Sequence, residues 1–324
     1  MPTFMVDSLP CRTGDQRCRR SASVPIMTMD GTPPRFAVGL PNVGVFADPA
    51  LLTELAGRAE RAGWDGVFVW DHVLYHHGWP VVDPTVVAAA IAATTTRIRL
   101  GILMTAVARR RIGKLAREIA SLDVLSGGRV VFGAGLGSMP AEYTAFGEPA
   151  DPRSRAARLD ESLAALAALW SGEPVTVHGE HVVVDGVAMA PTPVQRPRPP
   201  VWCAGRWPLR APFQRAARWD GVLPVHADYG RPTTMPAPML ADIVRYVHAR
   251  RRSAGTAGHP FDVVLEGATD ADAPDRGGAV VRPYAAAGLT WWVEALGWWR
   301  GGPDEARARV DAGPPLDAAA RADA

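Results

Sequence analysis

The chain has 324 residues, of which 48% are hydrophobic and 21% are charged, and its formal net charge is +2. This length and composition suit one large α/β barrel or two smaller domains. The small net charge argues against a nucleic-acid or acidic-membrane partner, and no apolar run has membrane-spanning length. Three cysteines are too few for a disulfide framework, so a reducing cytoplasm is the expected location.

Residues 1–34 show no hydrophobic period and are predicted to be a disordered extension, with Met27 or Met29 as an alternative start. Cys11 and Cys18 lack the close spacing and the partner ligands of a zinc site. We expect one folded domain over residues 35–315 and a frayed tail over 316–324.

From residue 35 onward, predicted strands alternate with predicted helices. Three helices begin with the pair Asp-Pro, at Asp48, Asp83 and Asp151, which combines an N-cap with a proline in the first turn. A helix over 112–126 ends at Gly127, because glycine adopts the left-handed cap conformation without steric cost. Further helices are expected around 213–218, 239–252, 279–287 and 303–310. Short β-branched and aromatic runs predict strands at 36–40, 66–70, 97–103, 129–132, 200–204, 221–225, 261–265 and 288–293.

Eight strand-then-helix units predict a (β/α)8 barrel. The segment 174–184 alternates around His178-Gly179 and predicts a β-hairpin inserted after the fourth helix. A doubly wound sheet is the alternative, but such a sheet seldom needs eight units.

In a barrel of this kind the functional site forms where the strands end, so the residues that follow each predicted strand are the candidates. His72 is the best acid or base candidate, since imidazole titrates near neutrality; the alternative is a histidine that holds its loop in place. Glu294 is a candidate acid with a raised pKa or, alternatively, a salt-bridge partner of an arginine. The other residues at strand ends are Pro41, Asn42, Asp71, Met104, Thr105, Gly205, Arg206, His226 and Glu266.

Gly133, Gly135 and Gly137 do not make a dinucleotide-binding fingerprint, because no helix follows them directly. These glycines either let the chain turn out of the barrel or leave bare backbone for a flat cofactor ring. Gly205 and Arg206 offer a bare backbone and a cation to an anion. The three histidines of DHVLYHH lack the pattern of a metal-dependent barrel hydrolase, so no metal ligands are assigned.

Several of these motifs, taken in order, resemble the bacterial luciferase-like family of flavin- and deazaflavin-dependent oxidoreductases. The motifs are WDH at 70–72, RIRLG at 97–101, KLAREIASLDVLSGGRVVFGAGLG at 114–137, ALWSGEPV at 168–175, PRPPVWCAG at 197–205 and RAARWDGVLP at 215–224. The resemblance covers roughly residues 36–315. It implies a (β/α)8 barrel with a cofactor ring at the strand ends and a non-proline cis peptide around Leu103-Met104-Thr105.

The resemblance implies either coenzyme F420 or FMN as the cofactor. It places His72 near the hydride-transfer centre, Gly205 and Arg206 at the cofactor phosphate, and Asn42, Asp71, Met104, Thr105 and Gly133 to Gly137 around the cofactor. Asp71 by pattern alone is structural, because adjacent strand residues point to opposite sides. The Asp71-His72 pair and the arginines at 109–111 favour F420; a solvated helix start is the alternative for the arginines.

The expected function is therefore hydride transfer or oxygen insertion on a small organic substrate, with a separate flavin or F420 reductase as a possible partner. A homodimer is the oligomeric state that the resemblance implies. Trp79, Trp207, Trp291 and Trp292 indicate an apolar pocket, although core packing explains each of them equally well. The rival hypothesis is a barrel that binds a flavin or another small ligand without turnover.

Overall fold

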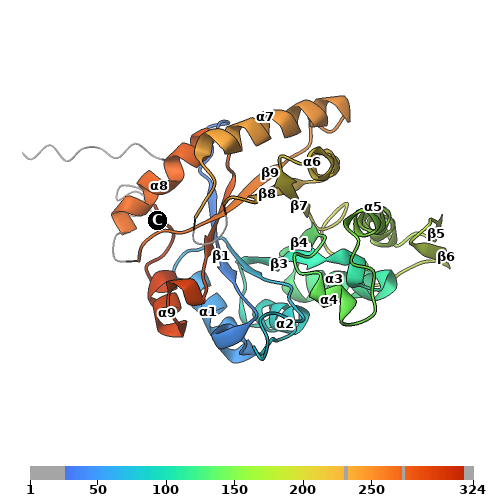
Figure 1. Cartoon of the computed structure of the whole chain (residues 1–324), viewed down its shortest axis with the longest axis horizontal. Coiled ribbons are helices and arrows are strands. Elements are labelled where there is room, and N and C mark those ends of the chain that lie inside the picture. The colour runs from blue at the N-terminus through green and yellow to red at the C-terminus, as the bar shows by residue number, and fades with distance from the viewer. Residues whose placement is uncertain (1–25, 230–232, 272–273, 317–324) are drawn as a thin grey trace, which may run out of the picture.

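The computed structural model describes residues 26–229, 233–271 and 274–316, and its ribbon shows a barrel with helices around it (Figure 1). Eight parallel strands close in the order β1-β10-β9-β8-β7-β4-β3-β2, because β1 pairs with both β10 and β2. The barrel strands are β1 (Arg35–Leu40), β2 (Gly66–Val69), β3 (Arg99–Ala106), β4 (Val130–Gly135), β7 (Val201–Trp207), β8 (Gly221–His226), β9 (Asp262–Gly267) and β10 (Trp291–Ala295).

Helices follow the strands around the outside of the barrel. They are α1 (Pro49–Arg61), α2 (Pro84–Thr94), α3 (Ile112–Ser126), α4 (Ala141–Thr144), α5 (Pro152–Leu169), α6 (Arg210–Ala216), α7 (Ala237–Ser253), α8 (Pro274–Ala286) and α9 (Pro303–Asp311). Short 3-10 turns lie at Gly44–Phe46, Val107–Arg109 and Trp298–Arg300.

The predicted (β/α)8 barrel is confirmed, and each of its eight strands overlaps the range expected from the sequence. The carboxylates of Asp48, Asp83 and Asp151 accept hydrogen bonds from backbone amides of their helices, as the Asp-Pro pairs predict. Gly127 ends α3 with a φ of 67° in the left-handed region. The start of α8 differs, because this helix begins at residue 274 rather than 279.

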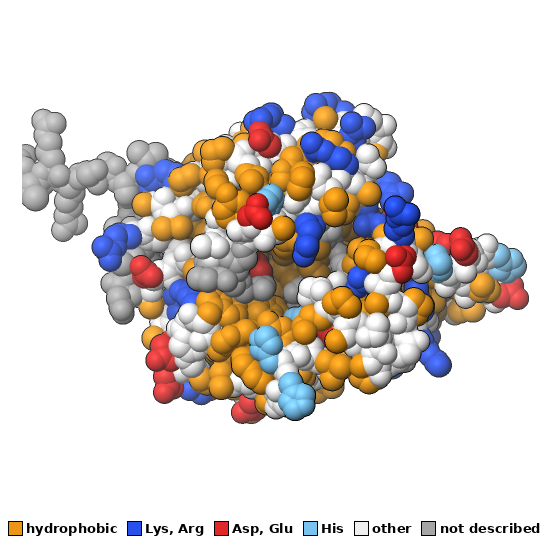
Figure 2. Space-filling model, viewed as in Figure 1, with side chains coloured by type: hydrophobic (Ala, Val, Ile, Leu, Met, Phe, Trp, Pro, Cys, Tyr) orange, Lys and Arg blue, Asp and Glu red, His pale blue; other side chains and the backbone are white. Residues whose placement is uncertain are grey.

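The segment expected to be a hairpin consists of β5 (Val175–His178) and β6 (Val183–Val187), which pair antiparallel. Figure 1 shows this pair beyond α5, outside the barrel wall. In the space-filling view, acidic and histidine side chains gather at this projecting end, and the middle of the visible face is hollowed (Figure 2).

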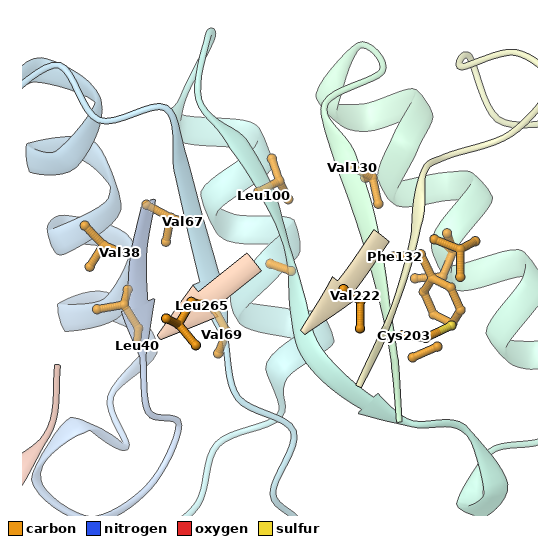
Figure 3. Close-up of a cluster of buried hydrophobic side chains, with 14 of the residues drawn as sticks. Val38, Leu40, Val67, Val69, Leu100, Val130, Phe132, Cys203, Val222 and Leu265 are labelled. Atoms are coloured by element: carbon orange, nitrogen blue, oxygen red, sulfur yellow. The ribbon is translucent and has the colours of Figure 1, made fainter. Parts of the chain in front are cut away.

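Two buried layers follow from the alternation of strand side chains. One layer lies between the strands and the outer helices, and Figure 3 shows its valines, leucines and Phe132 projecting from several strands. The other layer fills the barrel interior around Phe68, Trp202 and Trp291, whose ring centroids lie 5.4–6.0 Å apart. Because these rings fill the interior, a ligand of the barrel would lie at the strand ends rather than inside it.

The predicted terminal segments are only partly described. Residues 1–25, which include Cys11 and Cys18, and residues 317–324 lie outside the described residues. Residues 26–34 differ from the expected disordered extension, because Ile26 is only 6% exposed and packs in the outer core layer.

Within the described ranges, no helix has both the length and the apolar character needed to cross a bilayer. In the same part of the chain, no three His, Cys, Asp or Glu side chains gather closely enough to hold a metal ion.

Candidate active site

The histidine after β2 is held by a carboxylate from a short helix that is distant in sequence. His72 Nδ1 lies 3.2 Å from Glu142 Oε1, and the same oxygen accepts the Val73 backbone amide at 2.7 Å. Since an ionised carboxylate only accepts hydrogen bonds, the ring proton of neutral His72 is on Nδ1. Nε2 is therefore the atom left to accept or donate a proton.

Glu142 belongs to a buried charge network over the ends of β2, β3 and β4. Arg109 Nη1 lies 3.1 Å from Glu142 Oε2, and Arg109 Nη2 lies 2.9 Å from Asp71 Oδ1. Asp71 also pairs with Arg110 and accepts the Ala106 backbone amide at 2.7 Å. Two of the three consecutive arginines are thus ion-paired inside the protein, so neither a solvated helix start nor a site for an acidic cofactor tail describes them.

Asp71 and Asn42 both organise loops at the mouth. The side chain of Asp71 is fully buried in the network just described. Asn42 Nδ2 donates to the carbonyls of His72 at 2.9 Å and of Val82 at 2.7 Å, and Asn42 Oδ1 accepts the His72 amide. Direct contact of Asp71 and Asn42 with a cofactor stays a prediction. Their contacts favour a supporting role, in which they hold the loops that would touch the cofactor.

An aromatic cluster forms one wall of the mouth. Trp70 and Trp299 stack with ring centroids 5.7 Å apart and planes 6° apart, and Tyr75 lies 4.7 Å from the His72 ring. Trp79 belongs to the same cluster, because its ring centroid lies 4.9 Å from that of Trp298. Of the four tryptophans named from the sequence, Trp291 and Trp292 are buried core residues and Trp207 packs on Phe213.

The end of β3 carries the backbone feature that the resemblance implied. The peptide bond between Leu103 and Met104 is cis, and the pairing of β3 with β4 shifts register between Ile102 and Thr105. Thr105 is 1% exposed, and its buried Oγ1 has no hydrogen-bond partner among the described residues. Met104 packs on the interior layer and is partly exposed.

The glycines of β4 make room for this irregular strand. A Cβ atom on Gly133 would lie 2.3 Å from the Ile102 carbonyl oxygen, and one on Gly135 would lie 3.1 Å from Met104 Cβ. Gly137 has a φ of 72°, a conformation that favours glycine. Close packing against β3 therefore accounts for Gly133 and Gly135, rather than a bare surface left for a ring.

Gly133→Ala is expected to lower the free energy of unfolding by about 2–3 kcal/mol, because the new methyl group meets backbone rather than a side chain that can move. Gly57→Ala is the matched control, since a Cβ there meets only the flexible end of Arg61 and the helix gains up to about 1 kcal/mol. Urea unfolding of both variants measures the difference. Equal stabilities for the two would refute the packing role of Gly133.

A cavity of about 270 Å³ opens at the ends of β7 to β10. Arg206 is exposed in its lining and makes no ion pair with a described residue. Gly205 faces the opposite way: a Cβ there would lie 3.0 Å from the Phe213 ring, so this glycine lets α6 pack on β7. The cavity is lined by Ser138, Arg206, Leu223, Pro224, Val225, His226, Tyr229, Thr233, Thr234, Met235, Leu265, Glu266, Gly267, Ala268, Ala295 and Trp299.

Glu294 is fully buried and ion-paired, which is the alternative that the sequence offered for it. Arg300 Nη1 lies 2.5 Å and Arg309 Nε 3.3 Å from Glu294 Oε1. The Thr269 amide and hydroxyl donate to the two carboxylate oxygens at 2.8 and 2.9 Å. The acid role stays a prediction, but these donors occupy both oxygens.

The ionisation of Glu142 makes stability depend on pH. Burial raises the pKa of Glu142, but the His72 hydrogen bond and the Arg109 charge outweigh it and hold the pKa below 4.5. A lowered pKa contributes stability above the unfolded-state pKa, and this contribution is lost as the pH falls through the folded-state value. The stability difference between wild type and Glu142→Gln is thus expected to shrink from about pH 6 to about pH 3 in urea titrations. A difference independent of pH would contradict this prediction.

Two residues of the site had no clear signal in the sequence. Glu142 lies in the four-residue helix α4, which is too short to show a periodic pattern. Trp299 reaches the cavity from a 3-10 turn after β10, where the sequence shows only two adjacent tryptophans.

Comparisons with known proteins place this geometry in a family. The family model described as luciferase-like monooxygenase matches residues 29–273. An F420-dependent glucose-6-phosphate dehydrogenase of Gordonia bronchialis is 33% identical over 181 residues, which cover 54% of this chain and 53% of the relative. The match thus spans about half the length of that relative.

Two solved structures have the same fold. An F420-dependent secondary alcohol dehydrogenase in complex with an F420-acetone adduct has a TM-score of 0.71 at 17% identity, covering 86% of this chain and 96% of its own. The oxygenating constituent of 3,6-diketocamphane monooxygenase from Pseudomonas putida, in complex with FMN, has a TM-score of 0.66 at 13% identity and the same coverages. The match of the family model over most of the chain, together with the barrel, shows that the chain belongs to the luciferase-like monooxygenase family.

Proposed function

We propose that this chain is an oxidoreductase that binds coenzyme F420 at the barrel mouth and transfers a hydride to or from a small organic substrate. The observation that carries the proposal is the His72 ring, which Glu142 orients at the mouth with Nε2 left available. The F420-dependent name of the relative from Gordonia bronchialis supports the choice of cofactor.

The donors around the cavity fit a phosphate-bearing cofactor. Arg206 and Ser138 line the same cavity and offer a guanidinium and a hydroxyl, and both F420 and FMN carry a phosphate group. Thr105 Oγ1, at the end of β3, is a buried hydroxyl that lacks a partner among the described residues. We therefore assign Arg206 and Ser138 to the phosphate, and Met104 and Thr105 to the ring.

When bound, F420 supplies or accepts the hydride, whereas reduced FMN also reacts with oxygen. His72 Nε2 would hold the proton that accompanies hydride transfer, and Glu142 would stabilise the charged imidazolium. The aromatic cluster around Trp70 and Trp299 would exclude water from the substrate.

FMN is the second candidate cofactor, and two observations favour it. The diketocamphane monooxygenase structure, which has the same fold, holds FMN. In addition, Arg109 and Arg110 are engaged by Asp71 and Glu142, which removes the arginine argument for F420. An FMN enzyme would take reduced flavin from a separate reductase and insert oxygen. A homodimer remains part of either proposal.

The deciding experiment is a titration of the purified protein with F420 and with FMN, followed by quenching of tryptophan fluorescence. Selective micromolar quenching by F420 supports the proposal. Selective quenching by FMN would instead favour oxygen insertion as the reaction. Binding of a cofactor without turnover of any ketone, imine or enone supports the non-catalytic barrel. Binding of neither cofactor refutes the proposed function.

Arg206→Gln is expected to weaken F420 binding about tenfold, because a charged hydrogen bond to the phosphate is lost. Arg245→Gln is the matched control, since Arg245 is an exposed arginine on α7 whose ion pair within the described residues is with Asp242. The same fluorescence titration compares the two variants. An Arg206 variant with wild-type affinity would show that the phosphate lies elsewhere.

A further inference from the structure

A second histidine, at the end of β8, faces the cavity in a defined tautomeric state. His226 lines the cavity, and only 13% of its side chain is exposed. The chain turns back directly after it, because the Tyr229 amide donates to the His226 carbonyl oxygen. This turn brings the Asp228 backbone nitrogen to 3.1 Å from His226 Nδ1.

The contact with Asp228 decides which nitrogen of His226 carries the proton. A backbone N–H can only donate, so Nδ1 must accept and the ring proton is on Nε2. The Asp228 carboxylate is 3.8 Å from Nδ1 and 80% exposed, which is too distant for a hydrogen bond that would compete.

His226 is therefore the opposite tautomer of His72. The Glu142 carboxylate fixes the proton of neutral His72 on Nδ1, whereas the Asp228 amide fixes that of His226 on Nε2. No described residue accepts a hydrogen bond from His226 Nε2. One side of the mouth thus presents an imidazole that can accept a proton, and the other presents an imidazole N–H donor.

Part of the cavity lining near His226 is apolar, and the rest carries polar groups that include Arg206, Thr234 and Glu266. Leu223, Pro224 and Val225 precede it on β8, and Leu265 lies in the lining from β9. A hydrogen bond formed beside these apolar residues is stronger than one in water, and a donor left without a partner there is costly. The cavity of about 270 Å³ has room for a small organic molecule.

We propose that His226 is a substrate-binding residue whose Nε2–H donates to a carbonyl or hydroxyl oxygen of the substrate. This inference rests on the proposed function, and it limits the substrate to compact molecules that present an oxygen acceptor to the β8 side of the mouth. A neutral imidazole polarises such an oxygen without giving up its proton. Substrates without that oxygen leave the N–H unpaired and bind more weakly.

The tautomer is tested first, in the full-length protein labelled with ¹⁵N-histidine. His226→Gln identifies the His226 signals by their loss. We expect a protonated Nε2 and an unprotonated Nδ1. A proton on Nδ1 would overturn the proposal before any ligand is added.

The donor is then tested with two probes of one shape, cyclohexanone and methylenecyclohexane, which differ in a single oxygen. Wild type is expected to bind cyclohexanone about tenfold more tightly. His226→Gln, whose amide N–H reaches a similar place, should keep most of this preference, and His226→Leu should abolish it. His178→Leu in the hairpin is the control for loss of an imidazole elsewhere.

Equal affinities of wild type for the two probes, or a preference that survives in His226→Leu, would overturn the proposal. This test can fail without the proposed function failing, because F420 and FMN titrations of the same variants measure cofactor affinity separately from the affinity for the two probes. If neither cofactor binds, the function fails while the two probes still decide the role of His226.

Discussion

Replacing His72 with asparagine is expected to lower kcat by about 10²- to 10⁴-fold while leaving cofactor affinity within about twofold. The asparagine amide can still donate to Glu142 from a position close to that of Nδ1, so the loop keeps its anchor. The variant lacks the ring atom Nε2, to which the proposed proton transfer is assigned. Turnover is measured as reoxidation of reduced F420 with the best acceptor from a panel of ketones, imines and enones.

His77→Asn is the matched control for this experiment. His77 lies five residues along the same loop and is exposed. Its substitution should leave kcat within about twofold. If the His72 variant turned over as fast as this control, His72 would hold its loop and nothing more. That outcome would mean that the bound cofactor and the positioning of the substrate account for the rate without an acid or base from His72.

Glu294→Gln is expected to lower the free energy of unfolding by about 3–5 kcal/mol. The substitution removes the negative charge between Arg300 and Arg309, and the Arg309 side chain is only 5% exposed. A buried guanidinium without its counter-ion loses the interaction that offset its desolvation. Urea unfolding at neutral pH measures the loss.

The same variant separates the two roles considered for Glu294. If the ion pair is its whole role, the folded fraction of Glu294→Gln should turn over at close to the wild-type kcat. Glu54→Gln serves as control, because Glu54 pairs with two arginines at the surface, where ion pairs contribute only about 0–1 kcal/mol. A large fall in kcat with unchanged stability would instead restore the acid role.

The charge network at the mouth changes the basis for choosing a cofactor. In the sequence, three consecutive arginines suggested a site for an acidic cofactor tail. In the structure, Arg109 joins Asp71 to Glu142 and so connects the loops that follow β2, β3 and β4. The preference for F420 now rests on the names of relatives and on the predicted phosphate contact of Arg206, both of which the titrations test.

The sequence by itself determined the barrel. Helix starts at Asp48, Asp83 and Asp151 and the glycine stop at Gly127 are local signals, because each depends on residues within one turn. The apolar runs between the helices are too short to form helices themselves, which favours strands. Their alternation with helices favours one parallel barrel. Strand ends then indicated where His72 and Arg206 would lie.

Only the tertiary structure decided what those residues contact. Glu142 reaches His72 across 70 residues of chain, and Asp228 sets the tautomer of His226 through a backbone turn. Neither contact leaves a periodic pattern in the sequence, because an ion pair or a turn depends on where separate loops meet.

The glycines of β4 are a second feature that the sequence alone could not interpret. Their composition suggested bare backbone for a ligand, whereas the neighbouring strand β3 fills that space.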